Sequence, residues 1–309
     1  MTDRQQRVLI GTVEAGGTKF VCAVVESPVR VLERVVVPTA DPGSTFGACL
    51  RFFHAAAGRH GRLAAAGVAS FGPLQLHRDA PDYGCLMSTP KPGWSGINVL
   101  EPFRAALDVP VSLATDVGAA ALGELWLGTS KGQGSLAYVT VGTGIGGAIA
   151  PDLPDTRAMH AEMGHLLVRR DSRDADFAGV CPFHRDCLEG LASGPAIEAR
   201  WGCKLSSLPA GHSGRSIIAS YLGQLVSAIA LLHAPQRLVI GGGVLSDGLL
   251  LPLVRDWTRT WLGGYLPHLA DAQHMQDFIQ SPFLGGDSAI SGAALMALEA
   301  HQLTGAQSR

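Results

Sequence analysis

Short apolar runs separated by glycine-rich turns dominate the first forty residues of the chain. Residues 8–13 and 20–25 are nearly continuous apolar runs, and residues 29–37 alternate apolar and polar side chains. Runs of this length that end at turn residues predict β-strands. The glycines between the first two runs predict a tight turn. The chain is therefore expected to open with three sequential strands, a meander.

The same strand, glycine turn and strand pattern returns in the middle of the chain. Residues 135–141 and 148–150 predict strands on either side of the glycine-rich residues 142–147. Further strands are predicted at residues 63–70, 109–114 and 237–240, and helices at residues 45–59, 98–107, 118–126, 216–234 and 287–302. The repetition predicts two halves that each begin with a β-hairpin whose turn carries a hydroxyl group.

Composition and charge narrow the class of protein. The chain has 309 residues, for which two domains are the default, with 47% hydrophobic and 16% charged residues and 39 glycines. Such a composition indicates an ordered globular protein. The net charge of −2 and the lack of a basic run argue against nucleic acid as a partner. No uninterrupted apolar run reaches the roughly 18 residues of a membrane span. With a polar N-terminus and no disulfide-like cysteine spacing, we expect a cytoplasmic protein.

The first glycine turn has the groups that phosphate binding requires. The glycines let a phosphate approach the backbone closely, and the turn also contains a hydroxyl and a positive charge. A carboxylate that could hold Mg²⁺ precedes the turn. These groups are provided by Glu14, Gly16, Gly17, Thr18 and Lys19. A plain tight hairpin is the alternative interpretation.

Two later glycine-rich segments are further candidates for nucleotide contacts. Thr143 and Gly144 lie within the turn at 142–147, which contains four glycines and could bind phosphate from the second half of the chain. Gly242, in the run that follows the strand at 237–240, could lie against a ribose or base. Its alternative is an ordinary strand-to-helix turn. Neither hairpin turn matches a Walker P-loop or a Rossmann fingerprint.

Two thiols and two imidazoles have the spacing of a tetrahedral zinc site. These potential ligands are His165, Cys181, His184 and Cys187. Four protein ligands leave no open coordination position, so the zinc would be structural, and a zinc hydrolase is disfavoured. The alternative for His184 is an exposed loop histidine.

Carboxylates near these ligands and after a strand suggest chemistry on hydroxyl groups. Glu162 and Glu189 could accept hydrogen bonds from a substrate, and the second ring nitrogen of His165 could bind a hydroxyl while the first binds zinc. Both acids could instead be solvated surface groups. Asp116 follows a strand and precedes a helix, so it is either a general base or a helix N-cap.

Together these motifs resemble the ROK family of sugar kinases, and in particular its bacterial zinc-containing fructokinase branch. The resemblance covers nearly the whole chain and is carried by residues 14–19, 88–94, 116–124, 141–147, 162–165 and 187–189. There are two departures from the family pattern. Gly118 stands where many relatives have Asn, and the Cys-x-x-His-x-x-Cys run at 181–187 replaces a three-thiol pattern, as in the fructokinase branch.

The resemblance implies an α/β protein with the actin-like ATPase (ribonuclease H-like) fold, in two domains with an interdomain cleft. Each domain would contain a mixed five-stranded sheet. A small domain would comprise residues 1–114 plus about 291–309, and a large domain residues 115–290, with the zinc-binding segment at 165–187. A homodimer is also implied.

The implied activity is transfer of the γ-phosphate of ATP·Mg²⁺ to a hexose. Fructose would be the preferred acceptor and Asp116 the general base. Glu162, His165 and Glu189 would bind the sugar, while the two glycine turns bind the phosphates and Gly242 lies near the adenosine. A glucokinase or mannokinase of the same family and a sugar-binding pseudo-kinase remain alternatives. Sugar-responsive repressors of the family need an N-terminal DNA-binding segment, for which a first strand near residue 8 leaves no room.

Overall fold

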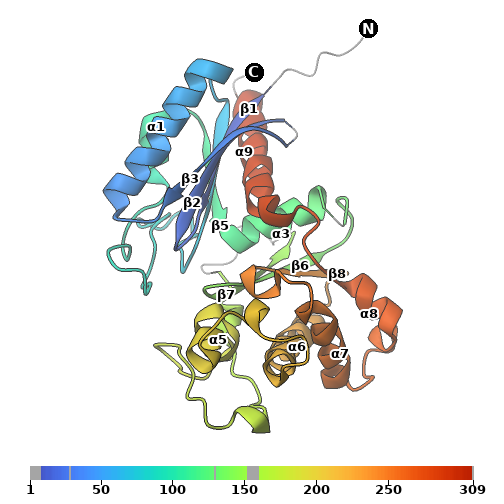
Figure 1. Ribbon diagram of the computed structural model, residues 1–309. Coiled ribbons are helices and arrows are strands. Elements are labelled where there is room, and N and C mark those ends of the chain that lie inside the picture. The colour runs from blue at the N-terminus through green and yellow to red at the C-terminus, as the bar shows by residue number, and fades with distance from the viewer. Residues whose placement is uncertain (1–7, 28, 129, 152–159, 308–309) are drawn as a thin grey trace. The chain divides into compact units, whose positions relative to one another are not determined.

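The computed structural model describes residues 8–27, 29–128, 130–151 and 160–307 of the chain. The chain divides into two compact units, which are described separately (Figure 1). The first unit comprises residues 1–123, 152–160 and 286–309, and the second comprises residues 124–151 and 161–285. The units therefore divide after Gly123 and Gly285, whereas the sequence suggested boundaries at 114 and about 291.

The first unit is built on a mixed sheet of five strands. These are β1 (Leu9–Ala15), β2 (Lys19–Glu26), β3 (Arg30–Pro38), β4 (Ala65–Ser70) and β5 (Val111–Thr115), in the order β3-β2-β1-β4-β5. The first three strands pair antiparallel, and β1, β4 and β5 pair parallel. The predicted meander and the expected five-stranded sheet are confirmed.

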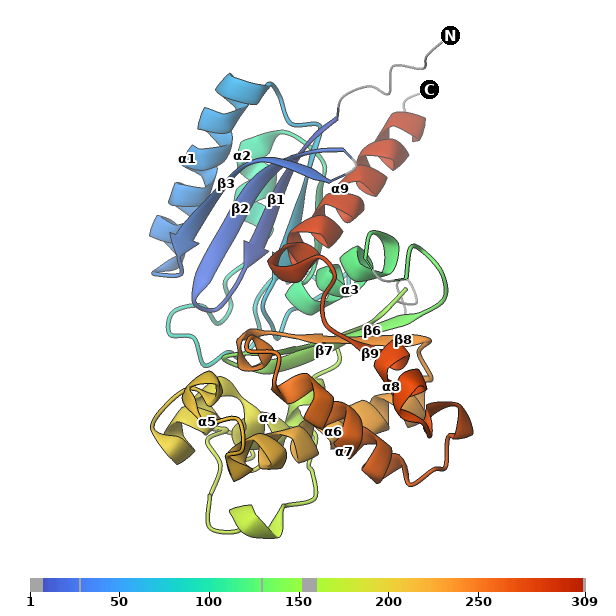
Figure 2. The same cartoon turned by 45° about the vertical axis from the view of Figure 1, so that its right-hand side comes forward.

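Helices cover both faces of this sheet, with α1 (Pro42–His60) on one face and α9 (Ser288–Gln307) on the other (Figures 1 and 2). Because side chains alternate along a strand, Val13 packs in the core that includes α1, whereas Ile10 packs against α9. Helix α1 begins where Asp41 accepts a hydrogen bond from the Ser44 amide at 2.9 Å, an N-cap. Two short helices, α2 (Glu101–Leu107) and α3 (Asp116–Trp126), complete the unit.

Glycines allow α3 and α9 to pack backbone to backbone. A Cβ added to Gly123 would overlap the carbonyl oxygen of Ser288, and one added to Gly292 would overlap that of Ala119. This contact places most of α3 in the first unit and explains why that unit extends beyond residue 114.

The second unit repeats the hairpin and parallel-strand arrangement. Strands β6 (Leu136–Val141) and β7 (Ile145–Ala150) form the predicted second hairpin, while β8 (Arg237–Gly241) and β9 (Ile279–Gln280) extend the sheet with parallel pairing. The order is β7-β6-β8-β9. Within the described residues this sheet has four strands, so the expectation of five is wrong for the described part of this unit. The fourth is only two residues long.

Helices α4 (Leu188–Ala192), α5 (Gly194–Trp201), α6 (Ser213–His233) and α7 (Leu250–Leu262) lie on the side of this sheet that is drawn below it in Figure 2. Helix α8 (Ala272–Phe278) lies at the end of the sheet next to β9. By length and composition α6 could cross a membrane, but most of its apolar stretch is buried inside the protein. Its Tyr221, Leu222 and Leu225 lie in the core of the unit, so α6 is a core helix.

Candidate active site

The register of the first sheet places Asp116 and the first glycine turn at the same edge. Ala15 of β1 pairs with Ser70 of β4, and Ser70 pairs with Thr115 of β5. These three residues form one row across the sheet, and the next residue along β1 and along β5 is Gly16 and Asp116 respectively. Two of the predicted functional segments, about 100 residues apart in sequence, therefore leave the sheet at the same edge.

The first turn is a tight hairpin that is braced from β3 and open to solvent. The Gly16 amide donates to the Lys19 carbonyl at 2.9 Å. Thr39, just after β3, donates its hydroxyl to the Gly16 carbonyl at 2.7 Å and its amide to the Thr18 carbonyl at 3.0 Å. A Cβ at Gly17 would meet no atom within 4 Å, which leaves room for a ligand to approach the backbone. Sequence analysis missed Thr39, whose only signal was a hydroxyl residue directly after a strand.

Glu14 lies near the end of β1 among three other charged groups. Burial raises the pKa of its carboxyl group, the cation of Lys19 opposes this, Asp287 raises it further, and Arg34 lowers it. The Nη2 atom of Arg34 donates to both carboxylate oxygens of Asp287 at 2.9 Å. Sequence analysis missed Arg34 and Asp287 because they are 253 residues apart and belong to no motif.

Asp116 is the first residue of α3, but it does not provide the side-chain cap of that helix. Thr115 Oγ1 accepts the Gly118 amide at 3.1 Å, which is the bond expected of an N-cap residue. The carboxylate of Asp116 accepts the adjacent Val117 amide at 2.8 Å. The N-cap alternative for Asp116 is therefore wrong, and its partly accessible carboxylate stays a candidate general base.

Gly118 lies close to the cap. A Cβ at residue 118 would lie 2.9 Å from Thr115 Oγ1, inside normal contact distance. An Asn at this position, as in the family pattern, would require the threonine hydroxyl to shift.

In the second unit, the turn between β6 and β7 is held by its own backbone and by the following helices. The Gly142 amide donates to the Gly144 carbonyl at 2.8 Å, and the Gly194 amide of α5 donates to the Gly142 carbonyl at 2.7 Å. Thr143 is exposed at the tip of the turn. Gly242, with φ of +99°, lies against the backbone of Val141, so it occupies the same edge of the second sheet.

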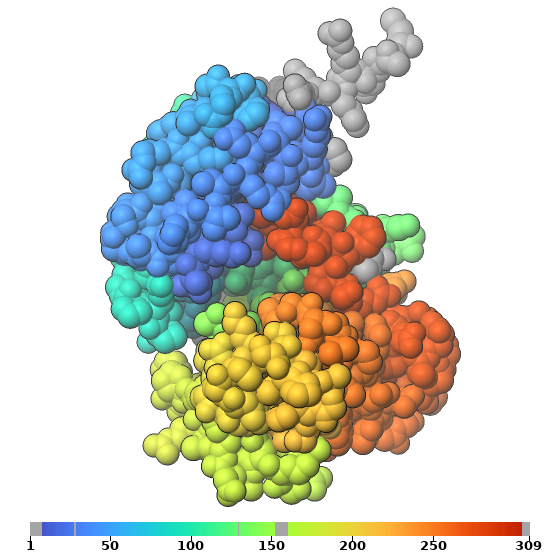
Figure 3. Space-filling view, viewed as in Figure 1, coloured from blue at the N-terminus to red at the C-terminus, as the bar shows by residue number. Residues whose placement is uncertain are grey.

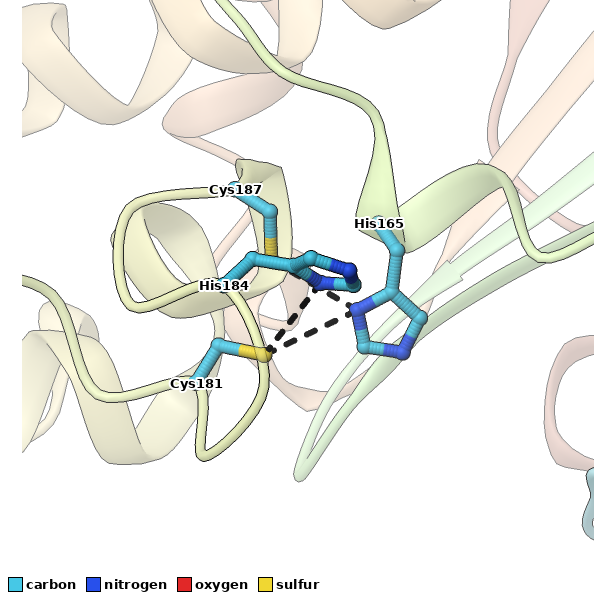
Figure 4. A group of neighbouring side chains, drawn as sticks. All are labelled: His165, Cys181, His184 and Cys187. Carbon is cyan, nitrogen blue, oxygen red and sulfur yellow. Dashed lines mark hydrogen bonds between the residues drawn. The ribbon is translucent and has the colours of Figure 1, made fainter.

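The four predicted metal ligands converge (Figure 4). Their ligand atoms all lie within 4.8 Å of one another. The Sγ–Nδ1 distance is 3.8 Å from Cys181 to His165, 3.8 Å from Cys181 to His184 and 3.5 Å from Cys187 to His165. In a tetrahedral zinc site, sulfur and nitrogen ligands are separated by about 3.6 Å.

The chemistry of these donors also fits a bound cation. Burial, together with the nearby Cys181, raises the pKa of the Cys187 thiol to about 11. Two adjacent buried thiols would not both ionise without a positive charge between them, and zinc supplies that charge. The donor set therefore fits zinc bound by two thiolates and two imidazoles.

The segment that carries these ligands lies on the surface of the second unit, where it is yellow-green in Figure 3. Cys181 and Cys187 are buried, and His184 is exposed beside the exposed ring of Phe183. The metal position is thus covered on the thiol side and open to solvent on the His184 side.

The three predicted sugar-binding residues lie around this cluster. His165 directs Nδ1 toward the thiols, and its other ring nitrogen points away from them (Figure 4). Burial of part of the Glu162 carboxyl group raises its pKa, His165 lowers it, and Glu189 raises it. His165 and Glu189 therefore both lie close enough to Glu162 to act on its charge. One oxygen of Glu189 also accepts the Ile145 amide at 2.8 Å, a bond that the sequence did not predict.

The predicted residues fall into one group in each unit. The group in the first unit consists of Glu14, Gly16, Gly17, Thr18, Lys19 and Asp116. The group in the second unit consists of Thr143, Gly144, Glu162, His165, Cys181, His184, Cys187, Glu189 and Gly242.

The repeated hairpin-and-parallel-sheet units, each with a glycine turn at the sheet edge, give the chain the actin-like ATPase fold of the ROK sugar kinases. A family model described as "ROK family" matches residues 10–300, and the chain belongs to this family. A fructokinase of Zymomonas mobilis is 39% identical over 96% of this chain and 99% of its own length. A fructokinase of Pediococcus pentosaceus is 35% identical over 94% of this chain and 98% of its own.

More distant relatives share the same fold. A glucokinase of Streptomyces coelicolor is 26% identical over 93% of this chain and 96% of its own. Among solved structures, the ROK hexokinase from Thermus thermophilus aligns with a TM-score of 0.71 and 27% identity, covering 94% of this chain and 98% of that one.

Proposed function

We propose that this protein is an ATP-dependent hexose kinase whose preferred acceptor is fructose, which it converts to fructose 6-phosphate. The observation that carries this proposal is the row Ala15–Ser70–Thr115, which sets Asp116 and the open glycine turn at one edge of the sheet. Fructose is favoured over glucose because the fructokinases are 39% and 35% identical to this chain and the Streptomyces glucokinase is 26% identical.

The residues of the first unit would perform the chemical step. Backbone amides around Gly17, the Thr18 hydroxyl and the Lys19 ammonium would bind the phosphates, and Glu14 would hold the magnesium of ATP·Mg²⁺ directly or through water. Asp116 would accept the proton of the attacking hydroxyl. That oxygen would bond to the γ-phosphorus while the bond to the leaving ADP oxygen breaks.

The residues of the second unit would bind the hexose and the other side of the nucleotide. Glu162 and Glu189 would accept hydrogen bonds from sugar hydroxyls, and the second ring nitrogen of His165 would bind another. The turn at Thr143 and Gly144 would bind phosphate, with the adenosine near Gly242.

The zinc would be structural in this mechanism. Bound by His165, Cys181, His184 and Cys187, it would supply a fixed charge that keeps both thiols ionised and stabilises the fold of the segment. His165 would then have a fixed tautomer, because its Nδ1 binds the metal and Nε2 keeps the proton. We also propose that the protein is a homodimer and acts in the cytoplasm.

A panel of hexoses tests the acceptor. Release of ADP is measured with fructose, mannose, glucose and N-acetylated hexoses at saturating ATP·Mg²⁺, with a sugar-free reaction as the control. The proposal expects the highest kcat/KM with fructose. A higher kcat/KM with glucose or mannose would assign the chain to the corresponding kinase instead. If no sugar increased ADP release, the protein would be a pseudo-kinase.

A further inference from the structure

Glu189 makes a contact that sugar binding does not require. Its Oε2 accepts a hydrogen bond at 2.8 Å from the backbone amide of Ile145. Ile145 is the first residue of β7 and directly follows Thr143 and Gly144 in the second glycine turn. It is only 4% exposed, so solvent cannot easily replace this acceptor. The carboxylate thus fixes the end of the turn that faces α4.

Glu189 lies so close to the turn that its carboxylate would have to shift to admit a side chain at residue 144. A Cβ there would lie 2.7 Å from Glu189 Oε2. Gly164 packs so closely on the Ile145 carbonyl that a Cβ would overlap that oxygen. The Gly142 carbonyl, at the start of the turn, accepts the Gly194 amide. The turn is therefore held at both of its ends.

Both segments that contact Ile145 are predicted sugar-binding segments. Gly164 lies between Glu162 and His165, and Glu189 follows the metal ligand Cys187 by two residues. The phosphate turn, the sugar-binding side chains and the metal ligands consequently form one block within the second unit.

We propose that Glu189 is a positioning residue for the second glycine turn as well as a hexose ligand. One carboxylate oxygen holds the Ile145 amide, and so sets the backbone that receives nucleotide phosphate, while the other receives a sugar hydroxyl. This inference rests on the proposed function in assigning the turn to nucleotide and the pocket to hexose. Its consequence is that loss of the carboxylate weakens nucleotide binding even when no sugar is present.

The test separates the two roles with three variants. Glu189→Ala removes both acceptors, and Glu189→Gln keeps an oxygen that can accept the Ile145 amide. Glu162→Ala removes the other proposed sugar-binding carboxylate. The affinity for AMPPNP·Mg²⁺ is measured by calorimetry without sugar, hydrogen exchange is followed over residues 142–146, and KM is measured for both substrates.

We expect Glu189→Ala to weaken AMPPNP binding by about tenfold and to accelerate exchange in the turn, because a buried amide loses a charged acceptor. Glu189→Gln should restore nucleotide affinity to within about twofold of wild type while the hexose KM stays raised. Glu162→Ala should raise the hexose KM alone. Wild-type AMPPNP affinity and wild-type exchange in Glu189→Ala would overturn the proposal.

A further variant, Gly144→Ala, keeps the proposal testable if Glu189→Ala does not fold. Gly144→Ala leaves Glu189 in place but pushes a Cβ against its Oε2, and it should also weaken AMPPNP binding and accelerate exchange at Ile145. Circular dichroism and thermal melting establish that each variant is folded. If wild type itself did not bind AMPPNP, the proposed function would fail, whereas the exchange measurement would still decide whether Glu189 fixes the turn.

Discussion

Arg34 and Asp287 form a two-bond ion pair that joins β3 to the residue before α9. A single guanidinium nitrogen of Arg34 lies 2.9 Å from each carboxylate oxygen. The two side chains are 43% and 40% exposed, so the pair contributes little to stability, about 0–1 kcal/mol. Its importance lies in its charges, which act on the buried carboxyl group of Glu14 in opposite directions.

Substitutions of this pair should shift the acid limb of the pH–activity profile in opposite directions. Ionised Glu14 is the form that would hold magnesium. Arg34→Ala removes a cation that lowers the Glu14 pKa, so the acid limb should move to higher pH. Asp287→Asn removes an anion that raises it, so the limb should move to lower pH. The measurement is kcat/KM for ATP·Mg²⁺ between pH 5 and 8, about the range in which a raised carboxyl pKa is visible. Shifts of the same sign in both variants would contradict the electrostatic explanation.

Asp116→Asn should reduce kcat by about 10²–10⁴-fold, the usual contribution of a general base. The substitution is nearly isosteric and keeps an oxygen that can accept the Val117 amide, so stability and AMPPNP affinity should remain near wild type. Single-turnover kinetics with fructose measure the chemical step directly. Near-normal turnover would remove Asp116 from the role of base.

Loss of a metal ligand should cost zinc and stability together. Cys181→Ala leaves three ligands, and because structural zinc supplies folding free energy, the variant should contain little zinc and melt at a lower temperature. Metal analysis of the purified protein and thermal melting, with and without a chelator, provide the measurements. Cys203→Ala, at a cysteine outside the cluster, is the matched control and should keep its zinc. Purified wild type without zinc would refute the metal assignment.

The Thr115 cap should account for part of the stability of the first unit. Thr115→Val keeps the shape of the side chain but loses the bond to the Gly118 amide, and should cost about 1 kcal/mol. Gly118→Asn would bring the chain closer to the family pattern, yet it should also destabilise the protein because its Cβ displaces Thr115 Oγ1. Urea unfolding of both single variants and the double variant measures this. If the cap is the shared cause, the two costs should not add; additive costs would point to independent effects.

Local sequence patterns predicted the parts of the fold that depend on short stretches of chain. Both hairpins, the strands of the first sheet and the four metal ligands were all visible as apolar runs, glycine clusters and cysteine spacing. The convergence of those ligands is confirmed in the structure, and occupancy by zinc stays a prediction. The roles of Asp116 and of the sugar-binding residues likewise stay predictions, although the register of β1, β4 and β5 places Asp116 at the same edge of the sheet as the first glycine turn.

Features that depend on distant residues could not be predicted in this way. The pairing of Arg34 with Asp287 requires α9 to pack on the sheet, and the bond from Glu189 to the Ile145 amide involves a backbone group, which leaves no mark in the sequence. Helix α7 was not predicted. Its first turn contains Pro252, and proline usually breaks a helix, although it is tolerated in the first turn. Strand β9 has two residues, too few to produce a pattern.

The position of α9 has a consequence for synthesis of the protein. This helix covers Ile10, Val21 and Ala23 on one face of the first sheet, yet it is synthesised after all the other described helices and strands. The second unit is almost continuous in sequence, so it can fold while this face of the first sheet is still uncovered. A nascent or truncated chain that lacks α9 would expose this apolar face to chaperones. The amino-terminal strands can therefore be released from chaperones only after α9 has been made and has packed on the sheet.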